Sequence, residues 1–327
     1  MKVLLTGATG FVGSHVLESL LDRGISVILL LRANSDTQFI APLLERVTVV
    51  RGSISDAESL RRAMKDATHA IHCAGATKAL HPREFYTVNQ KGTRNLVEAA
   101  NYWGRQIQRL VCISSAAAGH PATPDAPARE TDTPAPLTDY GNSKLAGERE
   151  VIQLARMPYV ILRPPGVYGP RDREFLKLFK AVKRHLLPSF GGGGQLLNLI
   201  YVKDLAEITV ECLTHPAVKN KIYNVASPET VTPRQIAVEI SRLLNVWTIP
   251  LPLPMPFLWF VCLAQEVLSQ ITRKANVVSL QKYRELAAPG WCCDTTRLKI
   301  ETGLEASTRL SHGLQSTLQW YMHHGWL

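Results

Sequence analysis

Short, continuous apolar runs alternate with helical patterns through the first half of this chain, and this alternation restricts the folds open to it. The runs lie at residues 2–5, 27–31, 47–50, 70–73, 110–113 and 159–162. Helical stretches lie between most of them, at 11–23, 56–64, 88–103 and 140–154. Strands that read as unbroken apolar runs are buried on both faces, as in a parallel sheet covered by helices. The sequence therefore predicts a doubly wound α/β fold.

Beyond residue 163 the alternation becomes irregular, which indicates a second, smaller part of the molecule. A helix is expected at 171–187, with an apolar face made of Phe175, Phe179, Val182 and Leu186, and a glycine run follows at 191–194. Later strands are expected at 198–202 and 223–226, with helices beginning at Asp204 and Thr232. We expect a main domain at 1–168, with segments near 196–228 returning to it, and a mostly helical cap at 169–195 and 229–327.

The net charge of +10 favours an anionic partner. A phosphorylated cofactor, an acidic substrate or an anionic membrane surface would each fit it. The alternative is a plain surplus of Lys and Arg that aids solubility. Nucleic acid is not expected, because no block of Lys and Arg interleaves with aromatic residues.

The six cysteines have no Cys-x-x-Cys spacing, and three of them sit inside apolar runs. This usage is typical of reduced thiols in a cytoplasmic protein, and no metal site is expected. The adjacent Cys292 and Cys293 could form a redox-active pair, although buried thiols are the expectation. The first strand follows Met1 and Lys2 directly, so we expect no signal peptide.

A glycine-rich loop lies between the first strand and the first helix. Gly7, Gly10 and Gly13 follow the spacing G-x-x-G-x-x-G. In such a loop the first glycine permits a tight turn, the second lets the backbone approach a pyrophosphate, and the third lets the helix pack closely on the sheet. The helix N-terminus adds free N–H groups and a partial positive charge. The loop therefore predicts a dinucleotide site.

The end of the second strand predicts which dinucleotide binds. A carboxylate at this place would bind the adenine ribose of NAD. The chain instead has Arg32, and no acid occurs before Asp36. A guanidinium can pair with a 2′-phosphate in a bidentate fork, so NADP is preferred over NAD. A solvent-facing arginine without a ligand is the alternative.

Tyr140 and Lys144 begin a predicted helix and share one of its faces. A tyrosine phenol is a poor base at neutral pH, but a nearby ammonium stabilises the phenolate, so such a pair can exchange a proton with a substrate oxygen. Ser115 follows the strand 110–113, where side chains face the ligand crevice of such folds. We expect Ser115, Tyr140 and Lys144 to be the catalytic residues.

These motifs together resemble the extended short-chain dehydrogenase/reductase family, in its epimerase/dehydratase-like branch, over essentially the whole chain. The other matching motifs are Ala74-Gly75, the segment 88–96 around Asn89, Arg163–Pro170, Asn198–Asp204 and Tyr223–Ala226. The resemblance implies a Rossmann-type doubly wound parallel sheet with a smaller, mostly helical C-terminal substrate-binding cap.

The resemblance also implies the role of further residues. The additional cofactor contacts would be Thr6, Phe11, Val12, Ser53, Ile54, Ala74, Gly75, Ala76 and Val167, besides Lys144. Asn89 would brace the site. The segments 78–83 and 171–200 would shape the substrate pocket together with the cap, with Lys78 and Asn198 as candidate substrate contacts.

Departures from the family pattern narrow the expected activity. Ser115 is followed by Ala116-Ala117 where sugar-nucleotide dehydratases carry an acidic pair, which argues against dehydration. The third strand is followed by Gly52-Ser53 in place of the usual Gly-Asp. The Pro-rich segment 249–264 and Trp291–Asp294 are similar to the branch near 3β-hydroxysteroid dehydrogenases and dihydroflavonol reductases, which act on bulky apolar ketones and alcohols.

We therefore expect an NAD(P)-dependent oxidoreductase that transfers a hydride to or from a hydroxyl or ketone carbon of a sizeable, largely apolar small-molecule substrate. The alternative within enzymes is a sugar-nucleotide epimerase with tightly bound NAD. A non-catalytic dinucleotide-binding module is the third possibility, which the intact Ser–Tyr–Lys set opposes. A homodimer is left open.

One apolar segment requires a separate interpretation. Residues 243–265 carry no charge, but Pro250, Pro252, Pro254 and Pro256 exclude a helix in the first half, so only about the last dozen residues can be helical. Such a helix is too short to span a bilayer. We expect it to form the core of the cap. The alternative is peripheral membrane contact, aided by the net charge and by Arg273 and Lys274.

Overall fold

The computed structural model describes residues 1–190, 194–272 and 279–327 of the chain, so Arg273, Lys274 and residues 191–193 of the glycine run lie outside the described residues.

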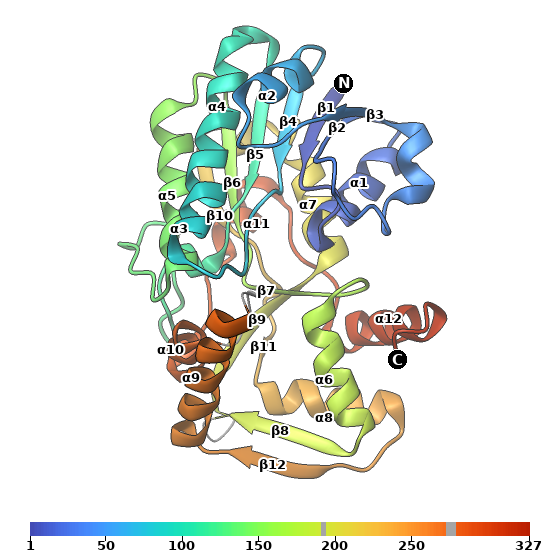
Figure 1. Cartoon of the computed structure of the whole chain (residues 1–327), viewed down its shortest axis with the longest axis vertical. Coiled ribbons are helices and arrows are strands. Elements are labelled where there is room, and N and C mark those ends of the chain that lie inside the picture. The colour runs from blue at the N-terminus through green and yellow to red at the C-terminus, as the bar shows by residue number, and fades with distance from the viewer. Residues whose placement is uncertain (191–193, 273–278) are drawn as a thin grey trace.

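The upper part in Figure 1 is a seven-stranded sheet in the order β3-β2-β1-β4-β5-β6-β10, with every neighbouring pair parallel. Its strands are β1 (Lys2–Thr6), β2 (Ser26–Leu31), β3 (Thr48–Arg51), β4 (His69–His72), β5 (Arg109–Ile113), β6 (Tyr159–Arg163) and β10 (Lys221–Asn224). The predicted doubly wound α/β class is confirmed.

Helices cover both faces of this sheet. One face carries α1 (Phe11–Asp22) and α7 (Val202–Glu211), and the other carries α2 (Ala57–Met64), α4 (Gly92–Tyr102) and α5 (Asp139–Leu154). In β1, Val3 and Leu5 pack in the core beneath α1 and α7, and Leu4 packs in the core beneath α2, α4 and α5. All three side chains are fully buried. This burial on both faces is why the strands read as unbroken apolar runs.

The lower part of the molecule is a smaller, mostly helical unit (Figure 1). Its elements are α6 (Arg173–Lys183), β8 (Leu186–Phe190), α8 (Pro233–Leu244), β12 (Ile249–Leu253), α9 (Met255–Thr272), α10 (Leu280–Ala287) and α12 (Leu310–His323). Its core joins α6, α8 and α12 through Phe179, Ile236, Leu314 and Tyr321. Helix α8 begins where predicted, because Thr232 and Gln235 form a reciprocal capping box.

A second sheet lies between the two parts. Strand β9 (Leu196–Tyr201) pairs with β7 (Gly166–Tyr168), β11 (Thr230–Val231) and β13 (Gly290–Trp291). Of the segments near 196–228, residues 221–224 return to the main sheet as β10, whereas 196–201 join this second sheet. The shorter elements are α3 (Pro82–Phe85), α11 (Thr296–Thr302), a π-helical turn at Tyr86–Lys91, and 3₁₀ turns at Ala41–Arg46, Gly104–Gln106, Ala116–Ala118 and Pro216–Val218.

Two expected helices differ from their predicted bounds. Helix α6 ends at Lys183, because His185 adopts a left-handed backbone (φ 65°) and Leu186 then pairs with Ile249 in the neighbouring strand. Leu186 is thus a strand residue and not part of the helical face. The helix expected at 88–103 begins as the π-helical turn and continues as α4.

The expectation that the apolar segment after residue 249 forms the core of the cap is wrong for most of its side chains. Pro250 and Pro252 lie in β12, and Pro256 is tolerated in the first turn of α9, so α9 reaches 18 residues. Only Leu258 and Cys262 of this helix are buried hydrophobics, whereas Phe257, Phe260 and Ile271 are exposed. Among the described residues, no helix has both the length and the apolar character needed to cross a bilayer.

A buried ion pair fastens α5 to the sheet. Glu148 accepts two hydrogen bonds from Arg163, at 2.9 Å from Nε and 2.6 Å from Nη2, and both side chains are almost fully buried. Ser114 at the end of β5 also donates to Glu148, at 2.5 Å. A charge-assisted, bidentate pair in this position orients the helix that carries Tyr140 and Lys144.

We predict that Glu148→Gln lowers the free energy of unfolding by about 3–5 kcal/mol, because it leaves the Arg163 charge buried without a counter-charge. Chemical denaturation measures this loss. Glu98→Gln is the matched control, since Glu98 forms an exposed ion pair with Arg94 on α4 and its loss should change stability little. Equal effects of the two substitutions would contradict the role given to Glu148.

Candidate active site

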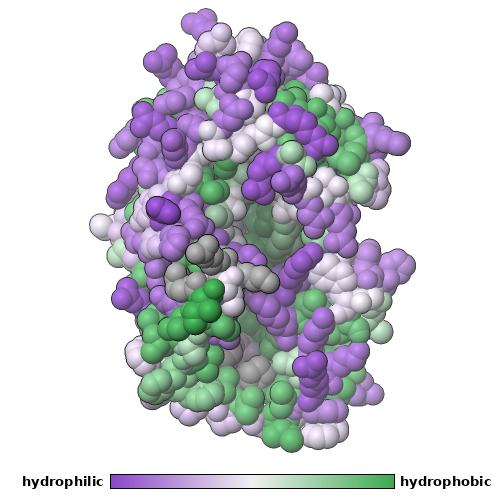
Figure 2. Space-filling view, viewed as in Figure 1, coloured by the Kyte–Doolittle hydropathy of each residue, from purple (hydrophilic) through white to green (hydrophobic). Residues whose placement is uncertain are grey.

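The site lies at the carboxyl ends of β1 and β4, where the strand order of the main sheet reverses. Ligands of open parallel sheets bind in the crevice that forms at this switch point. The glycine loop follows β1, and residues 73–76 follow β4. Figure 2 shows the surface hollowed between the upper and lower parts of the molecule.

The glycine loop has the close backbone packing that the sequence predicts. Gly7 has φ 77°, and a Cβ added to it would lie 2.5 Å from the Ala74 backbone nitrogen. A Cβ on Gly13 would lie 2.1 Å from the Gly7 carbonyl oxygen. Gly10 caps α1 without a side-chain hydrogen bond, so the first N–H groups of this helix remain open to an anion. These features fit the pyrophosphate of a dinucleotide.

A buried chain of hydrogen bonds connects this loop to the floor of the site. Thr6 contacts His72 Nδ1 (2.7 Å), His72 Nε2 contacts Thr93 Oγ1 (3.1 Å), and Thr93 donates to the Asn89 carbonyl (2.6 Å). Burial, with a contribution from the Lys144 charge, lowers the pKa of His72 to about 3, so its ring is neutral. Since the Thr93 proton is used, His72 must carry its own proton on Nε2 and accept one from Thr6.

Tyr140 and Lys144 lie in the first turns of α5, whose N-terminus is capped by Thr138. Lys144 Nζ donates to the Ile113 carbonyl at the end of β5, at 2.7 Å. A Cβ on Gly75 would lie 3.8 Å from this ammonium, so Lys144 borders the loop after β4. The Tyr140 ring meets the Phe85 ring edge to face, with centroids 6.0 Å apart. The structure thus places Lys144 beside the loop after β4, with Tyr140 one turn before it on the same helix.

Asn89 connects the loop after β4 to α5. Its Oδ1 accepts the Ala76 N–H (2.8 Å), and its Nδ2 donates to the Ala76 carbonyl (3.0 Å) and to Ser143 Oγ (2.9 Å). Ser143 in turn donates to the Tyr140 carbonyl (2.7 Å). The amide therefore fixes residues 74–76 relative to the tyrosine.

Ser115 and Ser114 have different surroundings at the end of β5. Ser115 is partly exposed, and its Oγ accepts the Ala117 N–H at 3.2 Å, which leaves the hydroxyl proton free for a ligand oxygen. Ser114 is buried against Glu148. Of the two adjacent serines, Ser115 is the one placed to contact a ligand.

Arg32 and the segment after β3 follow two neighbouring parallel strands at their carboxyl ends. The Arg32 side chain is exposed, and its guanidinium has no hydrogen-bond or ion-pair partner in the described part of the chain. The Ser53 hydroxyl lies 2.9 Å from that of Ser55, and Ile54 packs on Gly92 while its carbonyl accepts from Asn95. Arg32 is therefore available to a phosphate group.

The remaining candidate residues have varied positions. Val167 lies in β7, paired with Ile200, and Lys78 is exposed in the loop before α3. The Asn198 amide is buried and makes its hydrogen bonds within the protein: Nδ2 donates to the Ser227 and Glu229 carbonyls, and Oδ1 accepts from the Cys293 N–H. The roles of Lys78 and Asn198 in substrate binding stay predictions.

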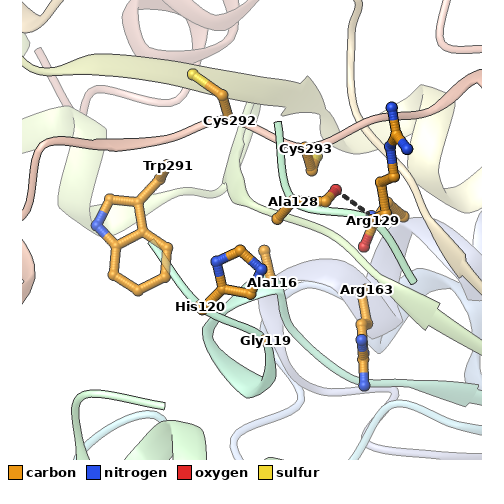
Figure 3. Close-up of a pocket in the computed structure, with 10 residues that line it drawn as sticks. Ala116, Gly119, His120, Ala128, Arg129, Arg163, Trp291, Cys292 and Cys293 are labelled. Carbon is orange, nitrogen blue, oxygen red and sulfur yellow. Dashed lines mark hydrogen bonds between the residues drawn. The ribbon is translucent and has the colours of Figure 1, made fainter. Parts of the chain in front are cut away.

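A small cavity lies beside the site, at the ends of β5, β6 and β10 (Figure 3). His120 and Trp291 line it, and Arg163 borders its other side; its volume of about 10 Å³ is room for roughly one water. All six cysteines are free, and burial raises the pKa of Cys293, at the cavity wall, to about 12. Cys292 is buried and Cys293 is half-buried, and both thiols are free in this structure.

Sequence reasoning missed the positioning residues His72, Ser143 and Glu148. The signal for Glu148 was present, because it continues the i, i+4 stripe of Tyr140 and Lys144 on α5. His72 lies in an apolar run, and only the fold places it against Thr6.

Comparisons with known proteins agree on one family. The model of the NAD dependent epimerase/dehydratase family matches residues 3–226. The ceramide reductase of Caulobacter vibrioides is 30% identical over 99% of this chain and 96% of its own length. The UDP-glucose 4-epimerase of Vibrio cholerae is 28% identical, over 77% of this chain and 79% of its own. Among solved structures, UDP-glucuronic acid 4-epimerase from Bacillus cereus in complex with NAD has the same fold, with a TM-score of 0.80, 22% identity, and coverage of 99% of each chain.

We predict that Gly7→Ala weakens dinucleotide binding at least about tenfold, because the added Cβ both strains a left-handed backbone and collides with the Ala74 backbone. Calorimetric titration with NADP and with NAD measures the loss. Gly24→Ala is the matched control: Gly24 also has a positive φ (68°) but open space around it. Unchanged binding by Gly7→Ala would show that the loop does not hold the dinucleotide.

Proposed function

The chain belongs to the NAD-dependent epimerase/dehydratase family, and we propose that within this family it is an oxidoreductase. It transfers a hydride between nicotinamide and a hydroxyl or ketone carbon of a sizeable, largely apolar substrate. The observation that supports this proposal is that Lys144 borders the loop after β4, one turn after Tyr140 on α5, while Ser115 ends β5 with its hydroxyl proton free.

The chemistry divides between the cofactor and three side chains. When bound, the nicotinamide supplies or accepts the hydride. Tyr140 gives a proton to the substrate oxygen in reduction and removes it in oxidation. Lys144 uses one of its three N–H groups on the Ile113 carbonyl, which leaves two for the phenol oxygen and for the nicotinamide ribose. Ser115 donates its free hydroxyl proton to the substrate oxygen and holds it in place.

Two observations support a large apolar substrate over a sugar nucleotide. The first is the ceramide reductase, which is 30% identical over 99% of this chain. The second bears only on dehydratases among the sugar-nucleotide enzymes: Ala116 and Ala117 after Ser115 offer no acid for dehydration. We therefore propose a lipid-like ketone or alcohol as the substrate class.

A sugar-nucleotide epimerase is the second candidate, because the Vibrio cholerae enzyme is nearly as similar over three quarters of the chain. An epimerase returns the hydride to its substrate and consumes no cofactor. Net oxidation of added NADPH by apolar ketones, followed at 1:1 stoichiometry with product, supports the oxidoreductase. Epimerisation of a sugar nucleotide without net cofactor change would replace it.

The cofactor we propose is NADP, with NAD as the alternative, on the strength of the unpaired Arg32 guanidinium at the end of β2. The place of action we propose is the cytoplasm, since six free cysteines suit a reducing compartment.

We predict that Tyr140→Phe lowers kcat at least about a hundredfold, the usual contribution of general acid–base catalysis, while cofactor affinity is kept. Steady-state kinetics and a cofactor titration measure the two quantities. Tyr102→Phe serves as the control, because Tyr102 is exposed at the end of α4 and contacts Arg61 and Trp103. Near-normal turnover by Tyr140→Phe would refute the assignment.

We predict that Arg32→Ala weakens NADP binding by about 1.5–3 kcal/mol, the value of a charge-assisted hydrogen bond, and leaves NAD binding nearly unchanged. Dissociation constants for both cofactors test this difference. Arg105→Ala, an exposed arginine in the turn after α4, should change neither. An equal loss for both cofactors would show that Arg32 does not read the 2′-phosphate.

A further inference from the structure

Exposed apolar side chains extend along α9 from its first turn to its last. Phe257, Phe260, Val267, Leu268 and Ile271 recur at helical spacing, and their exposed fractions run from 49% to 74%. Of the polar side chains that the structure describes on this helix, Gln265, Glu266 and Ser269 are half-buried and Thr272 is exposed at its end. Glu266 accepts the Leu280 N–H at 3.0 Å. A surface helix normally turns its polar face to water, so α9 has the inverse arrangement.

A second set of exposed apolar side chains lies along the two-stranded sheet of β8 and β12, which extends from α9 across the lower end of the molecule (Figure 1). Trp247, Ile249 and Leu251 precede α9, and Leu186 lies opposite Ile249 in the two-stranded sheet of β8 and β12. Together with the outward face of α9 they form what we call the apolar end surface. Contiguous exposed apolar groups of this kind mark a binding surface.

Lys180 and Arg184, at the end of α6, border the apolar end surface. The two other cations of this helix end have partners, because Lys177 pairs with Glu174 and Lys183 donates to the Leu327 carbonyl. Lys180 and Arg184 are exposed and form no ion pair with any described residue. His185, next to Arg184, stacks on Trp247 with centroids 4.2 Å apart, which fixes the cationic turn beside the exposed indole. The charge of this border therefore complements an anionic surface.

We propose that the apolar end surface docks on an anionic lipid bilayer, with α9 lying in the interface and the cationic turn at the headgroups. An apolar helix face, an exposed tryptophan and adjacent cations are the elements of interfacial binding. A second copy of this chain fits less well, because a two-fold symmetric contact through this surface would bring the same cations together. The docking does not depend on the proposed reaction.

The geometry connects the docked helix to the catalytic helix. The Glu266 carboxylate holds the start of α10, and Gln281 of α10 exchanges two hydrogen bonds with Asp139, at 2.6 and 2.5 Å. Asp139 immediately precedes Tyr140. A bilayer that holds α9 is therefore connected through α10 to the start of the helix that carries the tyrosine.

The test is co-sedimentation of the full chain with vesicles of phosphatidylcholine and phosphatidylglycerol, or of phosphatidylcholine alone, at low and moderate salt. We expect the protein to sediment with the anionic vesicles, less so at moderate salt. Phe260→Ser/Ile271→Ser should lower this partitioning at least about tenfold. Lys180→Gln/Arg184→Gln should lower it about fivefold per cation at low salt.

Matched controls separate the surface from general effects. Tyr102→Ser/Met322→Ser removes two apolar side chains of 63% and 64% exposure on other helices, and it should sediment like the parent. Thermal melts and NADP titration should be unchanged in all variants. A parent that stays in the supernatant at low salt overturns the proposal, as does a Phe260→Ser/Ile271→Ser variant that sediments like the parent. A dimer in analytical ultracentrifugation that this variant abolishes would assign the surface to a second copy instead.

Discussion

Helix α5 is fastened to the carboxyl edge of the sheet at successive turns, and the site depends on this attachment. Ser143 is held by Asn89, Lys144 by the Ile113 carbonyl, and Glu148 by Ser114 and Arg163. Tyr140, Lys144 and Glu148 are spaced by four residues, so one stripe of the helix carries both the reactive pair and its anchor. A helix fixed only by apolar contacts would be free to rotate its phenol away from the crevice. The buried ion pair opposes that rotation.

The charges around the crevice suit an anionic cofactor. The start of α1 presents open N–H groups, Lys144 contributes an ammonium, and Arg32 lies at the outer end. His72 adds no charge, because burial and Lys144 keep its pKa near 3. Glu148, one turn after Lys144 on α5, is paired with Arg163, so its negative charge is compensated.

The two parts of the molecule serve different purposes. The glycine loop after β1 tolerates few substitutions, since the backbone around Gly7 and Gly13 leaves no room for side chains. The cap is built from α6, α8, α9, α10 and α12, and its elements end in an apolar surface that no described residue covers. The proposed substrate and the proposed docking surface are both lipid-like. The same apolar chemistry would then serve substrate recognition and membrane docking.

The sequence by itself determined the sheet, the glycine loop and the common helix face of Tyr140 and Lys144, because each depends on local spacing. Unbroken apolar runs report burial on both faces, and Tyr140 and Lys144 share a helix face whatever surrounds them. Only the tertiary structure decided what depends on neighbours distant in the chain. It placed His72 against Thr6 and joined Glu148 to Arg163 across 15 residues. It also directed the hydrogen bonds of the Asn198 amide to groups within the protein. It also turned the apolar face of α9 outward. Composition cannot predict that direction, since a helix of the same residues could equally be buried, and the direction is decided by whether another element packs on it.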